Sequence, residues 1–473
     1  MRSSSRSAAP FASPGPVPAA APRRRYALVG VGARSQMYQD AIEGEYRPWA
    51  ELVAFCDLNP GRVEVARRRS AKNRAPVPRG YAAADFARMI AETKPDIVVV
   101  TTVDEVHDEF IVRAMELGCD VITEKPMTHT AAKCRRILEA RRRTGRSCRV
   151  SFNYRYSPPR SQVKDLLMRG EIGEVVSVDF HWLLNTLHGA DYFRRWHSEK
   201  KRSGGLLVHK STHHFDLVNW WLGAMPVSVY ATGQRGFYTP AMARRLGLEG
   251  YHERCHTCPE KAGCAFFFDL DGDAALKALY LEQEGYDGYI RDRCVFRPDI
   301  DIEDAMAVQV RYDNGVLLSY SLNAFCAWEG YTIAFNGTQG RLEHAIRESA
   351  YMSGTDTVQG GIDRDGVTTR IVPLRGAPRL IEPWPEEGSH GGGDAVMLRD
   401  LFLPAPPDDK FLRAADERAG AASILVGVAA NLCLETGQPV AIAELVPGLE
   451  RPDYPPIPAC DGPLTRPGRR APV

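Results

Sequence analysis

The sequence predicts an α/β protein with a parallel sheet in an N-terminal domain and a mostly antiparallel sheet in an α+β C-terminal domain. Two observations support this fold class. Over residues 24–152, short apolar segments alternate with helical ones, which is typical of βαβ units. Beyond residue 153, apolar and polar residues alternate over 175–182 and 307–312, which indicates strands with one exposed face.

Five strands are expected in the N-terminal domain, separated by helices. An apolar strand over 26–29 runs straight into a glycine turn, and a helix over 37–42 follows it. The continuous apolar segment 97–100 suits a sheet that helices cover on both faces. The other elements expected are strands over 52–57, 95–102, 120–124 and 148–152, and helices over 62–69, 86–90, 107–117 and 130–143.

A β-hairpin is the clearest feature of the second half. The turn Asp313-Asn314-Gly315 separates the alternating segment 307–312 from a second apolar segment over 316–320. Strands over 331–336 and 340–343 continue the pattern. We therefore expect a disordered tail over 1–23, domains over 24–152 and 153–446, and an irregular Pro-rich tail over 447–473.

Composition and charge are those of an ordinary soluble protein. The 473 residues suit two or three domains, 44% of them are hydrophobic, and the net charge is +1. That charge offers no field that would recruit nucleic acid or a membrane. The sequence contains no run of eighteen apolar residues, so we expect no transmembrane helix. The 11 cysteines favour a reducing compartment. We expect a cytoplasmic protein that binds a small molecule.

The glycine turn lies between the first strand and the first helix. Gly30, Gly32 and Ser35 occupy the small-residue positions of G-x-G-x-x-[G/A], with Ser35 as a departure. The first glycine permits the tight turn, and the second lets the backbone approach a pyrophosphate at the helix N-terminus. Asp57 ends the second strand, where an acid accepts hydrogen bonds from ribose hydroxyls. The pattern predicts a Rossmann domain that binds NAD, with NADP as the alternative because Arg62 lies nearby.

A lysine ends the fourth strand, at the sheet edge where parallel strands bind ligands. Thr101-Thr102, His107 and the segment 114–126, which ends in Glu124-Lys125-Pro126, resemble the signature TP…H…AL-x-x-GKHV-x-x-EKP of the Gfo/Idh/MocA family of sugar and cyclitol dehydrogenases. The resemblance implies that Lys125 orients the reacting hydroxyl and shares in proton transfer. The cofactor-binding residues expected are Gly30, Gly32, Ala33, Arg34, Ser35, Asp57, Thr101, Thr102, His107, Glu124 and Lys125.

A second part of the resemblance lies over 204–216. The family pattern G-G-x-L-x-D-x-G-x-H-x-x-D places its catalytic histidine on His213. His209 stands where the family has Asp, Ser211 stands where it has Gly, and Lys210 adds a cation. A histidine at position 209 can contact a substrate hydroxyl or tune the base, with electrostatics opposite to those of an acid. The catalytic residues that the resemblance implies are Lys125, His209 and His213.

Polar and aromatic residues elsewhere are candidates for substrate contacts. Tyr154 and Arg155 follow the fifth strand, in a segment that resembles the family's N-x-R-F-x-P linker. The segment 188–196 mixes polar and aromatic residues of the kind that stack on sugar rings, with surface packing as the alternative. His390 lies in a glycine-rich turn like one that sugar-acting members carry. The substrate contacts expected are Tyr154, Arg155, Asp191, Tyr192, Arg195, Lys210 and His390.

Four cysteines gather in an insertion over about 250–298 that the family pattern does not include. Cys255 and Cys258 form a C-x2-C-P knuckle, and Cys264 and Cys294 follow. Thiolates are preferred ligands of zinc, so one interpretation is a structural zinc site. The long gap before Cys294 and the lack of a second C-x2-C leave free or disulfide-linked thiols as the other interpretation.

Motifs and resemblance together predict an NAD(P)-dependent oxidoreductase that moves hydride between the nicotinamide and a secondary alcohol of a sugar, glycoside or cyclitol. His213 would take the hydroxyl proton, and Lys125 would position the oxygen. Two alternatives stay open. One is a redox-neutral glycosidase or lyase of the same family, and the other is a non-catalytic dinucleotide or sugar sensor. We also expect a homo-oligomer formed through the C-terminal sheet, with neither nucleic-acid nor membrane partners.

Overall fold

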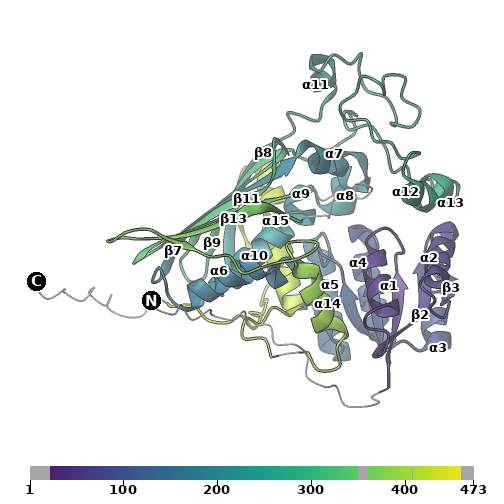
Figure 1. The fold of residues 1–473 in the computed structure, drawn as a ribbon, viewed down its shortest axis with the longest axis horizontal. Coiled ribbons are helices and arrows are strands. Elements are labelled where there is room, and N and C mark those ends of the chain that lie inside the picture. The colour runs from purple at the N-terminus through teal and green to yellow at the C-terminus, as the bar shows by residue number, and fades with distance from the viewer. Residues whose placement is uncertain (1–21, 350–360, 407, 460–473) are drawn as a thin grey trace, which may run out of the picture.

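The computed structural model describes residues 22–349, 361–406 and 408–459, which form two sheets and the helices around them (Figure 1). The parallel and mostly antiparallel sheets confirm the predicted fold class. The expected disordered tail lies outside the described residues except for its last two positions. The expected C-terminal tail is described as far as residue 459, where its residues from 451 onward form no regular element.

The N-terminal sheet has seven strands. In spatial order they are β15 (Ala415–Asp416), β6 (Cys148–Val150), β5 (Asp120–Thr123), β4 (Ile97–Val100), β1 (Arg24–Val29), β2 (Ala50–Asp57) and β3 (Arg79–Ala82). All pairs are parallel except that of β15 with β6. Along β1, Tyr26 and Leu28 enter one core and Ala27 and Val29 the other, because side chains alternate across a strand. Helices therefore cover both faces, as predicted.

Helices follow the strands in the order that the sequence predicts. They are α1 (Ser35–Glu43), α2 (Pro60–Lys72), α3 (Phe86–Thr93), α4 (His107–Glu116) and α5 (Ala131–Thr144). Sequence reasoning missed β3, because Tyr81 is its one buried side chain and no apolar run marks it.

The second sheet has nine strands. In spatial order they are β14 (Arg379–Ile381), β13 (Ile362–Pro373), β12 (Gly340–Glu348), β11 (Glu329–Gly337), β7 (Val175–Asn185), β10 (Leu317–Cys326), β9 (Ala305–Tyr312), β8 (Pro226–Gln234) and β16 (Val440–Ala441). Among the described strands of this second sheet, only β7 and β10 pair in parallel. Strands β9 and β10 form the predicted hairpin. At its turn, the N–H of Tyr312 donates a hydrogen bond to the carbonyl of Val316 at 2.9 Å.

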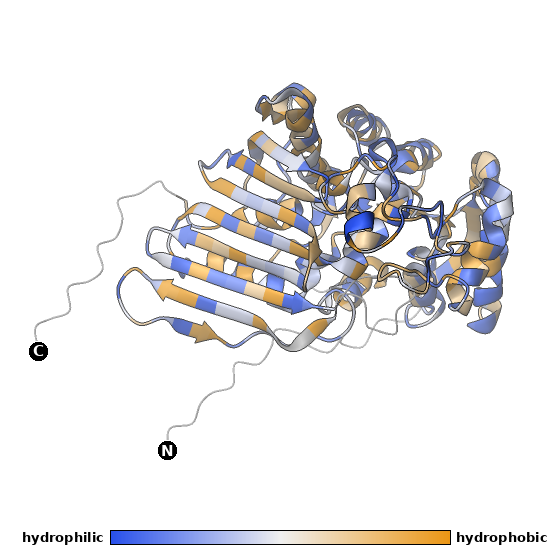
Figure 2. Cartoon of the chain, turned by 90° about the horizontal axis from the view of Figure 1, so that it is seen from above, coloured by the Kyte–Doolittle hydropathy of each residue, from blue (hydrophilic) through white to orange (hydrophobic). Residues whose placement is uncertain are grey.

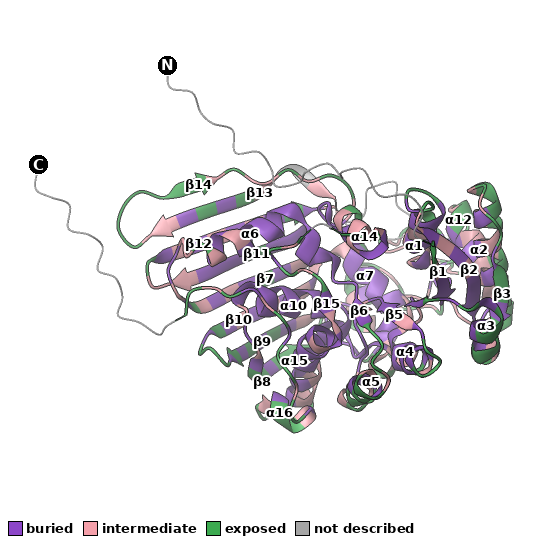
Figure 3. Cartoon of the chain, turned by 90° about the horizontal axis from the view of Figure 1, so that it is seen from below, coloured by how far each residue is buried: buried purple, intermediate pink, exposed green. Residues whose placement is uncertain are grey.

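Helices lie against one face of this sheet and leave the other open. The covering helices are α6 (Pro158–Met168), α10 (Thr212–Leu222) and α15 (Glu417–Thr436), as Figures 1 and 3 show. Polar and apolar residues alternate along several strands of this sheet (Figure 2), so that polar side chains tend to point to the open face and apolar ones to the helices. In β9 every second residue is buried, since only one face packs on the helices. By length and composition α15 could cross a membrane, but 67% of its apolar stretch is buried within the fold.

The cysteine-rich insertion joins β8 to β9 and extends back over the Rossmann domain. It contains the short helices α12 (Ala274–Leu279) and α13 (Glu284–Asp287), and α12 packs against α2 (Figure 1). Its own small core includes Phe268, Leu270 and Tyr280, and this core packs against Ala33 and Val65 of the Rossmann domain. The insertion is thus a third wall at the junction of the two domains.

Candidate active site

A cavity of ≈ 1080 Å³ lies where the two domains and the insertion meet. The carboxyl ends of the parallel strands open into it, as expected for a sheet of this type. Of the residues predicted to act in catalysis or to contact cofactor or substrate, Ser35 and Arg155 are the two that do not line it within the described chain. The predicted residues that line it are Gly30, Gly32, Ala33, Arg34, Asp57, Thr101, Thr102, His107, Glu124, Lys125, Tyr154, Asp191, Tyr192, Arg195, His209, Lys210, His213 and His390.

The glycine turn has the geometry of a dinucleotide site. Gly30 has φ +83°, and a Cβ there would lie 2.6 Å from the backbone of Thr102, so only glycine fits. The N–H of Val31 donates to Asp57 Oδ2 at 2.7 Å, which fixes the acid beside the turn. Burial raises the pKa of Asp57. Ser35 donates its hydroxyl to the Gly32 carbonyl at 2.7 Å, which accounts for its absence from the cavity wall.

Glu124 organises the strand end that carries the lysine. Its carboxylate accepts hydrogen bonds from Arg34 Nε at 2.5 Å, from the Tyr38 hydroxyl at 2.9 Å and from the Lys125 N–H at 3.1 Å. The His107 ring lies between the carbonyls of Thr102 and Pro126, at 3.0 and 2.9 Å. These contacts fix the backbone on both sides of Lys125.

Lys125 heads a chain of polar groups that crosses from one domain to the other. Its Nζ lies 3.4 Å from His209 Nε2, and His209 Nδ1 lies 2.6 Å from Asp104 Oδ2. Burial and the Lys125 ammonium lower the pKa of His209, so its neutral ring accepts from the lysine and donates to the acid. Burial lowers the pKa of Lys125 to about 8. Sequence reasoning missed Asp104, although it follows the end of β4 at the cavity edge.

His213 lies in the first turn of α10 and faces the cavity with a buried ring. Its Nδ1 has no hydrogen-bond partner among the described residues. The ring stacks on Tyr154, with centroids 4.3 Å apart and planes inclined by 17°. Burial, Lys125 and Lys210 lower its pKa, so the imidazole is neutral at pH 7. A neutral, fixed imidazole in the cavity wall can accept a proton.

Lys210 is a second buried cation, close to the first. Its Nζ donates to the Tyr154 hydroxyl at 3.3 Å and lies 4.7 Å from the centre of the Trp182 ring. Burial raises the pKa of Glu329 to about 8, and the Lys210 ammonium opposes that rise. Glu329 also contacts His188 at 2.7 Å. No motif marks Glu329, because it begins strand β11, far along the chain.

Charged and aromatic groups line the end of the cavity that lies in the second domain. Asp191 contacts Arg195 at 3.3 Å and Arg291 of the insertion at 2.8 Å. Burial would raise the pKa of Asp191, but the guanidinium of Arg291 holds it below its usual value. Tyr192 packs edge-on against His209, and His390 Nδ1 pairs with Asp394 at 2.7 Å.

Arg155 does not take the position expected of it. Its guanidinium donates two hydrogen bonds to Asp216, at 2.7 and 2.6 Å, and both side chains are fully buried. The expected substrate contact of Arg155 is therefore wrong. A buried guanidinium needs a paired carboxylate, and Asp216 is the carboxylate that meets it here.

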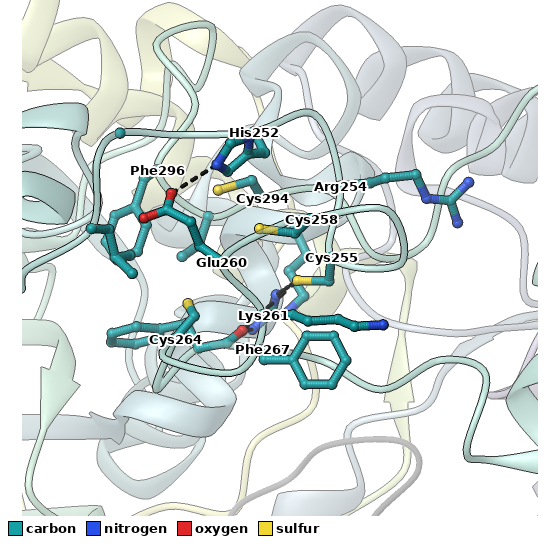
Figure 4. A pocket seen from close by; sticks show the side chains of 15 residues that line it. His252, Arg254, Cys255, Cys258, Glu260, Lys261, Cys264, Phe267, Cys294 and Phe296 are labelled. Carbon is teal, nitrogen blue, oxygen red and sulfur yellow. Dashed lines mark hydrogen bonds and ion pairs between the residues drawn. The ribbon is translucent and has the colours of Figure 1, made fainter.

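The four cysteines of the insertion line one small pocket, together with His252 and Glu260 (Figure 4). Arg194 donates to Cys255 Sγ at 3.3 Å, and His252 is bound to Glu260 at 2.7 Å. All four thiols are free. Among the described residues, no three His, Cys, Asp or Glu side chains are arranged to hold a metal ion. The cysteines that line the pocket are Cys255, Cys258, Cys264 and Cys294.

Comparison with known families matches both domains. An oxidoreductase family with an NAD-binding Rossmann fold matches residues 24–152, and the C-terminal alpha/beta domain of the same family matches residues 164–442. Fold and matches together define an NAD-binding oxidoreductase. The chain belongs to the Gfo/Idh/MocA oxidoreductases, which confirms the resemblance.

Individual relatives support the same assignment. YteT of Bacillus subtilis (strain 168), an oxidoreductase by name, is 38% identical over 88% of this chain and 97% of its own. Inositol 2-dehydrogenase of Rhizobium meliloti (strain 1021) is 30% identical over 44% of this chain and 58% of its own. D-glucoside 3-dehydrogenase of Escherichia coli (strain K12) is 26% identical over 42% of this chain and 54% of its own length.

Solved structures share the fold at low identity. WlbA dehydrogenase from Chromobacterium violaceum, in complex with NADH and UDP-GlcNAcA, has a TM-score of 0.58 and 19% identity, over 89% of this chain and 96% of its own. Aldose-aldose oxidoreductase from Caulobacter crescentus, complexed with glycerol, has a TM-score of 0.58 and 18% identity. The match covers 89% of this chain and 100% of that structure's chain.

Proposed function

We propose that this protein oxidises or reduces a secondary alcohol of a sugar, glycoside or cyclitol, with NAD as cofactor. The observation that carries the proposal is that the neutral imidazole of His213 lines the same cavity as Lys125 and the glycine turn. The glycine turn and Asp57 would hold the dinucleotide. When bound, the nicotinamide supplies the acceptor or donor of the hydride.

His213 takes the proton of the substrate hydroxyl as general base, because burial leaves its imidazole neutral. Lys125 donates a hydrogen bond to the same oxygen and stabilises the negative charge that develops on it. His209 accepts from Lys125 and donates to Asp104, so it holds the ammonium in place and connects it to a buried proton acceptor.

The remaining cavity residues suit a polyhydroxylated substrate. Carboxylates, guanidiniums and an ammonium offer acceptors and donors to several hydroxyls, and aromatic rings offer a stacking surface. The residues proposed to contact the substrate are Tyr154, Asp191, Tyr192, Arg195, Lys210 and His390.

One observation favours a second function. The cavity holds more buried proton carriers than a single proton transfer needs, since His188 and His197 line it beside His209, His213 and Lys210. Such a set suits a redox-neutral glycosidase or lyase, in which hydride leaves the substrate and later returns to it. That reaction cleaves a bond without net NADH.

A screen of sugars, glycosides and cyclitols with NAD tests the function. Net NADH absorbance with one class supports the dehydrogenase. Product without net NADH supports the redox-neutral reaction. If the protein binds NAD and a sugar but converts none of the substrates, the sensor hypothesis replaces both.

Lys125→Ala and His213→Ala should each lower kcat by roughly a hundredfold or more, because each removes a positioned acid–base group. NAD affinity, measured by isothermal titration, should stay nearly unchanged. The double variant should lose much less than the product of the two losses, because both groups act on one oxygen. Near-normal turnover in either single variant would contradict the assignment.

Cofactor preference should depend on Asp57. NAD should bind better than NADP, since a 2′-phosphate would meet a buried carboxylate at the end of β2. Asp57→Ala should narrow the difference between the two dissociation constants, measured by titration of the oxidised nucleotides. Equal binding of both nucleotides by the unmodified protein would overturn this preference.

We propose that copies of the chain form a homo-oligomer through the open face of the nine-stranded sheet, because helices cover the opposite face and leave this one exposed (Figure 2). We also propose a cytoplasmic location. All ten described cysteines are free, which suits a reducing compartment.

We propose that the thiol pocket takes one structural zinc ion, which requires its thiols to move together on binding, because no three ligand side chains among the described residues are arranged to hold a metal. Four thiols line one pocket, and the Arg194 guanidinium beside Cys255 would stabilise a thiolate. Protein purified without added metal should contain one zinc per chain by elemental analysis, and Cys255→Ser should lose it. Cys326→Ser, outside the pocket, is the control. Zinc near zero, with full stability in chelator, would rule the site out.

A further inference from the structure

The insertion reaches the part of the Rossmann domain that faces the dinucleotide. The Ala33 N–H, in the glycine turn, donates to the Tyr280 hydroxyl at 3.1 Å. The Gln283 carbonyl accepts from Asn59 Nδ2 at 2.9 Å. A Cβ on Gly61 would lie 1.8 Å from Gln283 Oε1, so the Gln283 side chain packs directly on the Gly61 backbone at the start of α2. These contacts place the insertion directly beside Asp57.

Arg62 is held between two carboxylates at this contact. Its Nη1 lies 2.7 Å from Asp287 of the insertion and 3.7 Å from Asp57 of the Rossmann domain. The side chains are largely buried, with exposed fractions of 11% for Arg62 and 7% for Asp287. Tyr280 and Tyr289 flank the guanidinium, with ring centres 5.7 and 5.6 Å away. One cation thus faces two anions in a space with little water.

The guanidinium is only partly satisfied. Nε and Nη2 of Arg62 are buried and have no hydrogen-bond partner among the described residues. An arginine at the end of the second strand accommodates the 2′-phosphate of NADP when its fork is available. Here the remaining nitrogen, Nη1, is directed at Asp287, and the net charge of the three groups is −1.

We propose that Asp287, an acid that the insertion supplies, makes the site select NAD against NADP by neutralising Arg62. A 2′-phosphate carries about −1.5 to −2 charges and would enter a site that is already negative. The ribose hydroxyls of NAD carry no charge and can donate to Asp57. Without Asp287 only Asp57 would oppose the charge of Arg62, and Nη1 could join the unpaired nitrogens in binding the phosphate through two charge-assisted hydrogen bonds. This inference rests on the proposed dinucleotide cofactor.

The test measures dissociation constants of NAD and NADP by isothermal titration, without substrate. Asp287→Asn keeps the shape of the side chain and removes its charge. NADP should bind roughly tenfold more tightly, and NAD affinity should change less than about threefold. Asp271→Asn is the matched control, since Asp271 is an exposed acid of the same insertion that pairs with Lys277 at 2.7 Å. It should change neither constant.

A second variant separates release of Arg62 from a general loss of negative charge. Arg62→Ala alone should not improve NADP binding, because it leaves two carboxylates facing the phosphate. Combined with Asp287→Asn, it should abolish the tenfold gain. If Asp287→Asn destabilises the protein, Arg62→Ala still decides, because tighter NADP binding by that variant overturns the proposal.

The outcomes also separate this inference from the proposed function. If Asp287→Asn binds NAD normally and NADP no better, the role of Asp287 is overturned and the dehydrogenase proposal stands. An equal gain in the Arg62→Ala background overturns the role of Arg62. If the unmodified protein binds neither nucleotide, both proposals fall.

Discussion

The structure depends most on the cost of burying several cations in one cavity. An ionised group loses its hydration there, so its charge persists only where a carboxylate or a hydrogen bond compensates. Lys125 has the His209–Asp104 chain, and Lys210 donates to the Tyr154 hydroxyl. His213 forms no ion pair with a carboxylate among the described residues, and burial beside Lys125 and Lys210 lowers its pKa. A substrate oxygen that becomes negative would relieve this excess of positive charge, which is the condition that alcohol oxidation needs.

A buried ion pair beside the cavity holds His213, the proposed proton acceptor, in place. Arg155 and Asp216 form two hydrogen bonds with each other in the core. Asp216 lies one turn after His213 on α10, and Arg155 directly follows Tyr154, which stacks on the His213 ring. The pair therefore ties the two faces of that stack together. An arginine in the family-like linker is explained by this support rather than by a substrate contact.

The sequence predicted the features that local patterns determine. Apolar strands, turn residues and the motifs around Gly30, Lys125 and His213 place those side chains at strand ends and at a helix start. Sequence patterns did not predict three of the charged residues in and beside the cavity, because each reaches the site through tertiary packing and none belongs to a motif. These residues are Asp104, Asp287 and Glu329. Arg155 and Ser35 were assigned to the site by their positions in motifs. Their hydrogen bonds to Asp216 and to Gly32, which no sequence pattern encodes, direct them elsewhere.

The insertion connects the two ends of the cavity through a very short segment. Asp287 pairs with Arg62 beside the Rossmann acid, and four residues later Arg291 pairs with Asp191 at the end of the cavity that is proposed to hold the substrate. Four residues span at most roughly 14 Å of chain, so neither ion pair can shift far without pulling on the other. Tyr289 lies between them and flanks Arg62. A family member without this segment would hold its cofactor and substrate ends through the two domains alone. Here a third element adds a direct mechanical link between them.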